Sequence, residues 1–381
     1  MTADNSTIIR EIDDIRSKLR HVLAAPNRWG GVLRRNTFAR AIQGSNSIEG
    51  IHVSTEDAIA AIEGEEPSET DRETFREILG YRDAMTYVLR LATDPHFSYS
   101  DALIKGLHYM VLKHNLTKNP GMWRPGSIYV RDESRGVTVY EGPAIDSVPE
   151  LVTELVLSLN VSPPDAPALV RAAMGHLNLV MIHPFSDGNG RMARILQTLI
   201  LGREGIIDPR FSSIEEYLGR NTTDYYSVLA RVGEGAWNPE NSARPWVEFC
   251  LIAHFNQATT LLRRTRETER VWDELESLVK HCGFPERTIY ALSDAAFGYK
   301  VRNSSYRAAA DINDTLASKD LKVLVDAGFL LSDGEKRGRF YVASNAIREI
   351  RERNREAKSV YRPSAPESLF LPGMDPQSSL F

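Results

Sequence analysis

Apolar residues recur along most of the chain at the three- and four-residue spacing of amphipathic helices, so we expect a mainly α-helical fold. Residues 1–95 are predicted to form an N-terminal helical region. Its helices are expected at 7–25, at 36–62 with a break at Gly50, and at 68–93.

Residues 96–260 are predicted to be the main helical core, because the same spacing continues through them to about Phe255. Two apolar helices are expected within it, near Ala168–Ile182 and near Met192–Leu201. A polar, glycine-bearing loop joins them, and it leads into the start of the second helix.

A small α+β, winged-helix-like domain is predicted at 268–345, after a highly charged helical continuation at 261–270. Its helices are expected at 271–281, 286–296 and 307–327, and its hairpin at Gly328–Leu331 and Phe340–Val342, joined by a turn at Gly334–Gly338. Residues 346–381 are expected to contain a helix end and then a disordered tail rich in Pro and Ser.

Composition is that of an ordinary water-soluble protein, with 42% hydrophobic and 25% charged residues among 381. The net charge of −5 gives no general attraction to nucleic acid. Cys250 and Cys282 are too few for a disulfide framework and favour a reducing compartment. Since neither a signal peptide nor a long apolar run is evident, we expect a cytoplasmic protein with no membrane partner.

The loop between the two core helices has the pattern of an anion site. It contains Gly188 and Gly190, which let the backbone approach a ligand, and the first N–H groups of the next helix favour a negative charge. Arg191 and Arg194 lie about one helical turn apart and are expected to reach the same polyphosphate.

Two further residues indicate a reaction at this site. Asp187 is a hard oxygen ligand of the kind that Mg²⁺ shares with phosphates. His183 lies beside the glycine turn and could take a proton from an incoming hydroxyl. The residues by themselves therefore indicate a phosphate-transfer site with its own base.

Residues 183–194 resemble the motif HxFx(D/E)GNGRxxR of the Fic/Doc family at every defined position, and the resemblance extends over roughly residues 35–255. It implies a protein adenylyltransferase that transfers AMP from ATP to a Tyr, Thr or Ser hydroxyl of a target protein. His183 would be the catalytic base, and Asp187 would bind Mg²⁺. The nucleotide-binding residues that it implies are Gly188, Asn189, Gly190, Arg191, Arg194 and Tyr226.

The resemblance also assigns a docking segment, Gly126–Tyr140. Gly126–Val130 and Gly136–Tyr140 are similar to the two short strands of the family's flap, which would align the target protein by strand addition. Downstream, Tyr225 and Tyr226 match a tyrosine pair near the family's adenine pocket.

Ser45-Asn-Ser-Ile-Glu49-Gly50 matches the (S/T)xxxE(G/N) pattern of the family's inhibitory helix, in the class that has this helix N-terminal to the core. Ser45 and Glu49 share one helical face, and the Glu49 carboxylate could engage Arg194 in place of the γ-phosphate. Two other residues are assigned to packing: His176 to the core, and Phe185 as a buried anchor of the loop.

Alternative functions stay open at this point: another donor nucleotide, removal of AMP with Glu49 positioning a water, or a DNA-binding regulator that senses nucleotide. Residues 268–345 contain eleven Lys and Arg against twelve Asp and Glu, which favours protein docking or homodimerisation over DNA. Lys336, Arg337 and Arg339 are the main argument for DNA.

The last five residues, Gln377–Phe381, have the form QxxLF. This resembles the short peptide by which bacterial replication and repair proteins bind the DNA sliding clamp. At the end of a tail rich in Pro and Ser, such a motif would be free to reach a partner. The sequence therefore predicts a sliding clamp as a partner.

Overall fold

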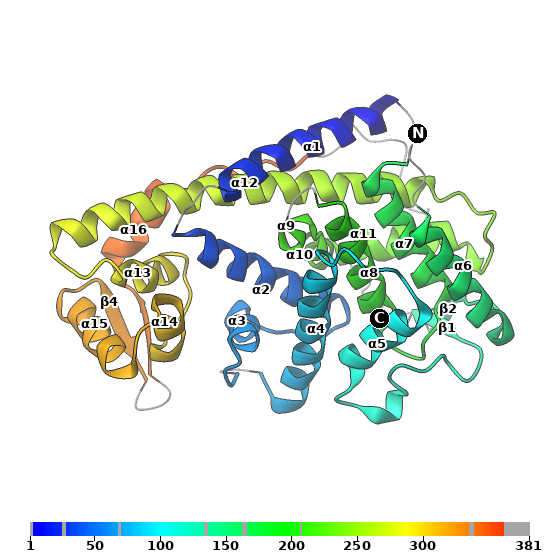
Figure 1. Cartoon of the computed structure of the whole chain (residues 1–381), viewed down its shortest axis with the longest axis horizontal. Helices are drawn as coiled ribbons and strands as arrows, with labels where there is room; N and C mark the ends of the chain where they lie inside the picture. The colour runs from blue at the N-terminus through cyan, green and yellow to red at the C-terminus, as the bar shows by residue number, and fades with distance from the viewer. Residues whose placement is uncertain are drawn as a thin grey trace. The chain divides into compact units, whose positions relative to one another are not determined.

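The computed structural model describes residues 3–24, 28–67, 70–132, 136–161, 166–205, 208–334 and 339–361. Along these residues the chain is mainly helical, as the apolar spacing predicts, with short strands in two small sheets (Figure 1). Within the same ranges, no helix has both the length and the apolar character needed to cross a lipid bilayer. The predicted clamp-binding segment Gln377–Phe381 lies outside the described residues.

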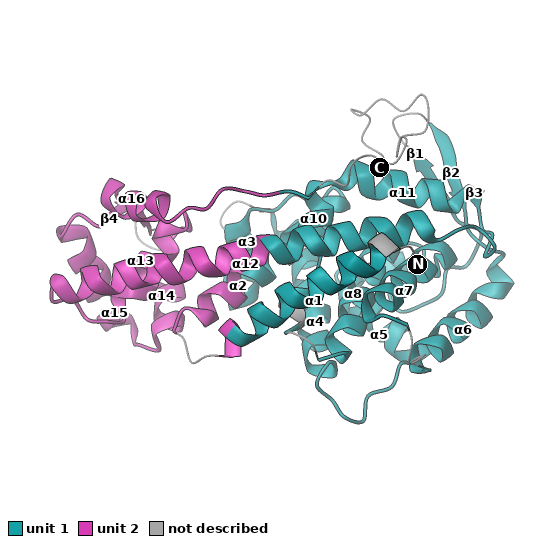
Figure 2. Ribbon diagram, turned by 90° about the horizontal axis from the view of Figure 1, so that it is seen from above, with its two compact units in different colours: residues 1–21, 37–259, 360–381 teal, residues 22–36, 260–359 magenta. Residues whose placement is uncertain are grey.

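The chain divides into two compact units, which Figure 2 colours separately. The first consists of residues 1–21, 37–259 and 360–381. Its helices are α1 (Ala3–Ala24), α2 (Gly30–Ile48), α3 (Thr55–Glu63), α4 (Arg72–Leu91), α5 (Asp101–Leu112), α6 (Val148–Asn160), α7 (Ala168–Ile182), α8 (Asn189–Arg203), α9 (Pro209–Ser212), α10 (Glu215–Arg220), α11 (Thr222–Gly233) and α12 (Arg244–His281). One end of each of α1, α2 and α12 belongs to the second unit. Short 3₁₀ turns are η1 (Leu116–Lys118) and η2 (Ile145–Ser147).

The central helices agree with the apolar pattern. α7 occupies the predicted range, whereas α8 begins at Asn189 rather than Met192, so part of the glycine turn belongs to its first turn. The predicted break at Gly50 is confirmed: α2 ends at Ile48, and Gly50 has a φ of 76°. α3 then starts behind Ser54, whose side chain accepts a hydrogen bond from a backbone N–H of its first turn.

A small sheet lies beside the C-terminal end of α7. Its strands β1 (Tyr129–Asp132) and β2 (Val137–Glu141) are antiparallel, with a register shift between Val130 and Arg131. The predicted hairpin is therefore confirmed, although its first strand begins at Tyr129 rather than Gly126. A third strand, β3 (Gly235–Ala236), pairs parallel to β2, so β1 keeps a free edge among the described strands.

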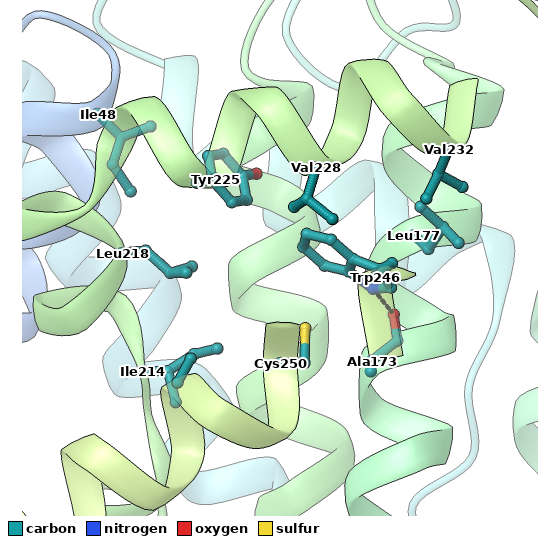
Figure 3. Packing of buried hydrophobic residues seen from close by; sticks show 11 residues of the cluster. Ile48, Ala173, Leu177, Ile214, Leu218, Tyr225, Val228, Val232, Trp246 and Cys250 are labelled. Atoms are coloured by element: carbon teal, nitrogen blue, oxygen red, sulfur yellow. Dashed lines mark hydrogen bonds between the residues drawn. The ribbon is translucent and has the colours of Figure 1, made fainter. Parts of the chain in front are cut away.

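An apolar cluster fixes the helices that carry the site (Figure 3). Trp246 of α12 is fully buried, and its indole N–H donates to the carbonyl oxygen of Ala173 at 2.7 Å. Buried residues packed in the same cluster are Ile48, Leu177, Ile214, Leu218, Tyr225, Val228, Val232, Cys250 and Ala253. Since they come from α2, α7, α10 and its N-cap, α11 and α12, the cluster fixes the positions of these helices relative to one another.

The second unit consists of residues 22–36 and 260–359. Besides the ends of shared helices it contains α13 (Thr288–Ala296), α14 (Asn303–Ala310), α15 (Asp314–Asp326), β4 (Leu330–Asp333), β5 (Phe340–Ala343) and α16 (Asn345–Arg353). β4 and β5 are antiparallel, which confirms the second predicted hairpin, and its turn at 335–338 lies outside the described residues. The winged-helix interpretation of this unit stays a prediction.

One helix prediction in this unit is wrong. Residues 307–327 form two helices, because α14 ends at Ala310 and Asp311 takes a left-handed φ of 51°. Asn313 then caps α15, its side-chain oxygen accepting from Leu316 N–H at 2.9 Å. Asp311 is a short polar residue and therefore tolerates the left-handed conformation that ends α14. Asn313 favours the N-cap position, where a new helix begins, over the interior of a helix.

Candidate functional site

His183 ends α7 in a left-handed conformation, with φ 50°. Its ring Nδ1 lies 3.1 Å from the carbonyl oxygen of Val180. Since a carbonyl only accepts, Nδ1 carries the ring proton and Nε2 keeps a lone pair. Burial lowers the pKa of His183, so the ring is neutral at pH 7 and can act as a base.

The glycine turn leaves the start of α8 open to an anion. Gly188 is the N-cap, with φ 76°, and no side chain caps the helix. The first N–H groups of α8, at Asn189 and Gly190, are therefore available to a negatively charged ligand. A Cβ on Gly190 would lie 2.7 Å from Glu49 Oε1, so a larger residue would collide with that carboxylate.

The loop is held from beneath by Phe185 and Asn189. The Asn189 amide accepts from Phe185 N–H and donates to Phe185 O, both at 2.9 Å. Phe185 is fully buried and stacks on His108 with ring centroids 3.6 Å apart, which confirms the predicted anchor. His108, which the sequence did not single out, also lies 3.0 Å from the carbonyl oxygen of Asp187 through Nε2. Asn189 thus shapes the loop with its side chain and offers only its backbone to a ligand.

Asp187 is an ionised carboxylate in the same loop. Its Oδ1 accepts from Gly188 N–H at 2.6 Å, and its Oδ2 pairs with Lys118 of η1. Burial raises the pKa of Asp187, but Lys118 and Arg191 outweigh this effect and hold the pKa below its ordinary value. Lys118 is a second residue that the sequence did not indicate.

Arg194 is buried and is bound by the end of α2. Its Nε donates to Ser45 Oγ at 2.7 Å, and its Nη2 donates to Ser45 O at 3.0 Å and to Glu49 Oε1 at 2.6 Å. Its Nη1 has no hydrogen-bond partner within the described residues. Burial lowers the pKa of Arg194, but the Glu49 carboxylate outweighs this, so the guanidinium stays charged. The structure therefore brings Ser45, Glu49 and Arg194 together.

Arg191 points to a different neighbour. Its Nη1 donates to Glu77 of α4 at 2.6 Å, and its Nη2 lies 3.8 Å from Asp187 Oδ1. A buried arginine needs such a carboxylate, because burying an unpaired charge is very costly. Arg191 is absent from the residues that line the cavity where Arg194 lies, and the contact of both arginines with one polyphosphate stays a prediction.

These groups meet in a cavity of about 480 Å³, a size that suits a nucleotide-sized ligand. The Tyr226 hydroxyl, on its wall, donates to Ile48 O at 3.0 Å. The lining residues are Glu49, Ile128, Tyr129, Val130, Arg131, Val139, Tyr140, Val180, Met181, His183, Ser186, Asp187, Gly188, Asn189, Gly190, Arg194, Tyr225, Tyr226, Leu229 and Ala230. The cavity therefore joins His183, the start of α8, Glu49 and the hairpin.

Arg124 ties the hairpin to the base and is a third residue that the sequence did not indicate. Its Nε donates to His183 O at 3.0 Å, its Nη1 to Gly126 O at 2.6 Å, and its Nη2 to Pro143 O. The Tyr140 hydroxyl adds a hydrogen bond of 2.7 Å to a carbonyl at the end of α7. These bonds fix the hairpin relative to the His183 ring.

Comparison with known proteins agrees with this geometry. Residues 98–201 match the Fic/DOC family model. The protein adenylyltransferase Fic of Nematostella vectensis is 27% identical over 286 residues, covering 70% of this chain and 61% of that protein. The protein adenylyltransferase fic-1 of Caenorhabditis elegans is 28% identical, covering 63% of this chain and 45% of that protein. The chain thus spans about half to three fifths of the length of these relatives.

Solved structures show the same fold. A Fic family protein from Desulfovibrio desulfuricans G20 is similar over 91% of this chain and 97% of its own, with a TM-score of 0.59 and 21% identity. Fic-1 from C. elegans is similar over 68% of this chain and 72% of its own, with a TM-score of 0.55 and 23% identity. The helical core, hairpin and anion loop define a Fic fold. Residues 98–201 are the part of the chain that matches the Fic/DOC family model, and the solved structures show the same fold around them.

Proposed function

We propose that the protein is an adenylyltransferase that moves AMP from ATP to a Tyr, Thr or Ser hydroxyl of a target protein. The observation that carries the proposal is the setting of His183, whose free Nε2 shares one cavity with the open start of α8 and with Arg194. A base beside an anion site is what phosphorus transfer to a hydroxyl requires. The names of the relatives, protein adenylyltransferases, support the same reaction.

In the proposed reaction the target hydroxyl oxygen attacks the α-phosphorus of ATP while His183 Nε2 takes its proton. The bond from the α-phosphorus to the bridging oxygen of the β-phosphate breaks, and pyrophosphate leaves. The N–H groups of Asn189 and Gly190 stabilise negative charge on the α-phosphate oxygens. Arg194 offers its unused Nη1 to the terminal phosphate.

Asp187 is the residue that would hold Mg²⁺. It is ionised, it lines the cavity, and it lies at the turn that precedes α8. No cluster of three or more His, Cys, Asp and Glu side chains suited to a metal occurs in the described ranges. That fits Mg²⁺, which usually takes one or two carboxylates and completes its shell with phosphates and water. When bound, the ion would neutralise phosphate charge, and Lys118 would have to release Asp187.

We propose that the target segment binds along the free edge of β1. Ile128 O accepts from Gly142 N–H at 3.1 Å, so Ile128 faces β2 and the backbone groups of Tyr129 face the free edge. Strand addition there would bring a target hydroxyl into the cavity with His183. Tyr129→Pro removes an edge N–H and should reduce transfer to target proteins, whereas Tyr129→Ala keeps the N–H and is the matched control.

We also propose that Glu49 inhibits the enzyme. Glu49 occupies Nη2 of Arg194 at 2.6 Å, and Ser45 occupies its Nε, so most of the guanidinium fork is engaged before any phosphate arrives. ATP bound against an engaged Arg194 would have its α-phosphate out of line with the attacking hydroxyl. Removal of AMP is the second candidate, because the Glu49 carboxylate faces the same cavity and could position a water.

The position of the label in ATP tests the proposed function. The Glu49→Gly chain is incubated with a lysate and with ATP labelled either at the α- or at the γ-phosphate. Transfer of the α-label, with one pyrophosphate released per label, is the expected result. Transfer of the γ-label would show phosphate transfer instead, and no transfer of either label would refute a transferase. AMP removal is measured separately. Protein that has first been modified with AMP is incubated with the wild-type chain, and the loss of AMP from it is followed.

A further inference from the structure

A series of buried polar side chains, here called the relay, leads from the N-terminal helix to the cavity. Arg16 Nη2 lies 3.3 Å from His254 Nδ1, and His254 Nε2 lies 3.2 Å from Gln197 Nε2. Gln197 Oε1 lies 2.6 Å from His176 Nδ1, and His176 Nε2 lies 3.1 Å from the Tyr225 hydroxyl. All five side chains are at most 2% exposed, which confirms the core assignment of His176. Of the five, Tyr225 lines the cavity.

Both histidines of the relay are neutral at pH 7. Burial lowers the pKa of His176 to about 3, and burial together with the charge of Arg16 lowers the pKa of His254 well below its ordinary value. Burial lowers the pKa of Arg16 only to about 10, so Arg16 stays charged. A neutral imidazole has one donor and one acceptor nitrogen, so what it accepts on one side fixes what it donates on the other.

Arg16 sets the direction of the relay, because a guanidinium only donates. His254 therefore accepts at Nδ1 and carries its proton on Nε2, where it would face the amide N–H groups of Gln197. A half-turn of the Gln197 amide presents its oxygen to His254 instead and leaves the shape of the side chain unchanged. In that orientation the amide would donate to His176 Nδ1, and His176 Nε2–H would donate to the Tyr225 oxygen.

We propose that Arg16 is a positioning residue that, through the relay, makes the Tyr225 hydroxyl a hydrogen-bond donor to a phosphate or ribose oxygen of the bound nucleotide. Since the Tyr225 oxygen accepts from His176, its own proton is left for an acceptor in the cavity. With the relay reversed, Tyr225 would donate to His176 and would have no proton left for the ligand. The ligand in this proposal rests on the proposed function.

The direction of the relay can be measured without nucleotide, which separates this proposal from the proposed function. The full chain is labelled with ¹⁵N-histidine, and two-bond ¹H–¹⁵N spectra identify the tautomer of each ring. His176→Gln and His254→Gln assign the two signals. We expect both rings as the Nε2–H tautomer. A wild-type chain with either ring as Nδ1–H overturns the proposal, and this outcome depends on no variant except for assignment.

Nucleotide affinity tests the consequence for the ligand, by calorimetry with ATP in the Glu49→Gly background. Arg16→Met should change the tautomer of His254 and weaken ATP binding about ten-fold, the effect of losing one hydrogen bond to a charged group. Tyr225→Phe should weaken binding equally, and the double variant should lose no more. Arg16→Lys, which keeps a donor, should restore affinity.

Arg20→Met is the matched control, since Arg20 lies on an exposed face of the same helix and should affect neither readout. Arg16→Met with unchanged tautomers, or with full ATP affinity, overturns the proposal. A Glu49→Gly chain that binds no ATP would refute the proposed function and the ligand named here, whereas the tautomers would still decide the direction of the relay.

Discussion

The two compact units differ in what they do with buried charge. In the unit formed by 22–36 and 260–359, Glu267 is fully buried and pairs with Arg263 at 2.6 Å and Arg351 at 3.0 Å. The Arg351 guanidinium also lies 4.7 Å from the ring centroid of Phe297. Both carboxylate oxygens of Glu267 are paired, and Nη1 of Arg351, like Nη1 of Arg194, has no hydrogen-bond partner among the described residues. A carboxylate shared by two arginines fixes the fold and has little capacity to bind a further ion.

In the unit formed by 1–21, 37–259 and 360–381, here called the Fic unit because it contains residues 98–201, buried polar groups are matched only in part. Arg194 pairs with Glu49 and still has an unpartnered Nη1 among the described residues, and His183 keeps a free Nε2. The start of α8 adds N–H groups that no side chain caps. Because leaving such donors unmatched costs stability, their concentration in one cavity marks the place where a ligand completes the set.

The largest effect is expected from the base. His183→Ala should reduce AMP transfer by about 10²–10⁴-fold while ATP binding stays nearly intact, because the base contacts the target hydroxyl and not the nucleotide. Since His183 has a φ of 50°, His183→Asn, which tolerates that conformation, separates loss of the base from backbone strain. Rates are measured with α-labelled ATP. If either variant transfers the label as fast as the chain that keeps His183, the base assignment is wrong.

The next effect should be on stability alone. Glu267→Ala leaves two partly buried cations without a carboxylate and should lower the free energy of unfolding by about 3 kcal/mol, measured in urea. Asp273→Ala, at an exposed position of the same helix, should change it by less than about 0.5 kcal/mol. AMP transfer per folded molecule should be unchanged in both. A loss of transfer in folded Glu267→Ala would contradict the division of roles between the units.

Freeing Arg194 should give a gain in activity. Glu49→Gly should raise the rate of AMP transfer about ten- to a hundred-fold, the value of one charge-assisted hydrogen bond. Glu49→Gln, which keeps the shape but not the charge, should give an intermediate gain. Adding Arg194→Ala to Glu49→Gly should reverse much of it. An unchanged rate in Glu49→Gly would exclude inhibition, and a fall would favour AMP removal as the main activity.

Mild acid should destabilise the Fic unit through its buried histidines. His176 and His108 have pKa values lowered by burial to about 3 and about 4, against an ordinary value of 6.5. Their contribution to stability is complete above pH 6.5. Below it the unfolded chain binds protons that the folded chain does not, so the free energy of unfolding should fall by about 1.4 kcal/mol per pH unit for each ring.

Hydrogen exchange between pH 6.5 and pH 5 checks this, because carboxylates titrate mostly below that window. Peptides of the Fic unit should lose protection before those of 260–359, where His281, the only histidine, is exposed. An equal loss of exchange protection in both units would show that the buried histidines do not determine the stability of the protein between pH 6.5 and pH 5.

Asp187→Ala should have the smallest effect under saturating conditions. Without the carboxylate the magnesium requirement should rise steeply, while excess Mg²⁺ recovers part of the rate through the phosphates alone. The measurement is the rate of AMP transfer against Mg²⁺ concentration, with Asp146→Ala, outside the cavity, as the control. An unchanged magnesium dependence would remove Asp187 as the ligand.

Much of the site could be predicted because its parts are neighbours along the chain. A helix end, a glycine turn and a helix start place His183, Asp187 and the first turn of α8 together by local geometry alone. The family pattern at Ser45 and Glu49 added one distant segment, which the structure brings to Arg194. The split of 307–327 could also have been foreseen, since Asn313 followed by Asp314 is a helix-start signal.

What the sequence alone determined is therefore the helical frame and, within it, the loop from His183 to the first turn of α8. The tertiary structure alone decided the directions of the side chains. α8 is enclosed, with every residue from Arg191 to Gly202 buried, so the partner of each arginine depends on which helix covers that side. Arg191 pairs with Glu77 of α4, whereas Arg194 binds Ser45 of α2 and Glu49 directly after it. Arg124 and Lys118 contact His183 and Asp187 from positions far away in the sequence. No local periodicity encodes such long-range contacts, because they depend on how whole helices pack.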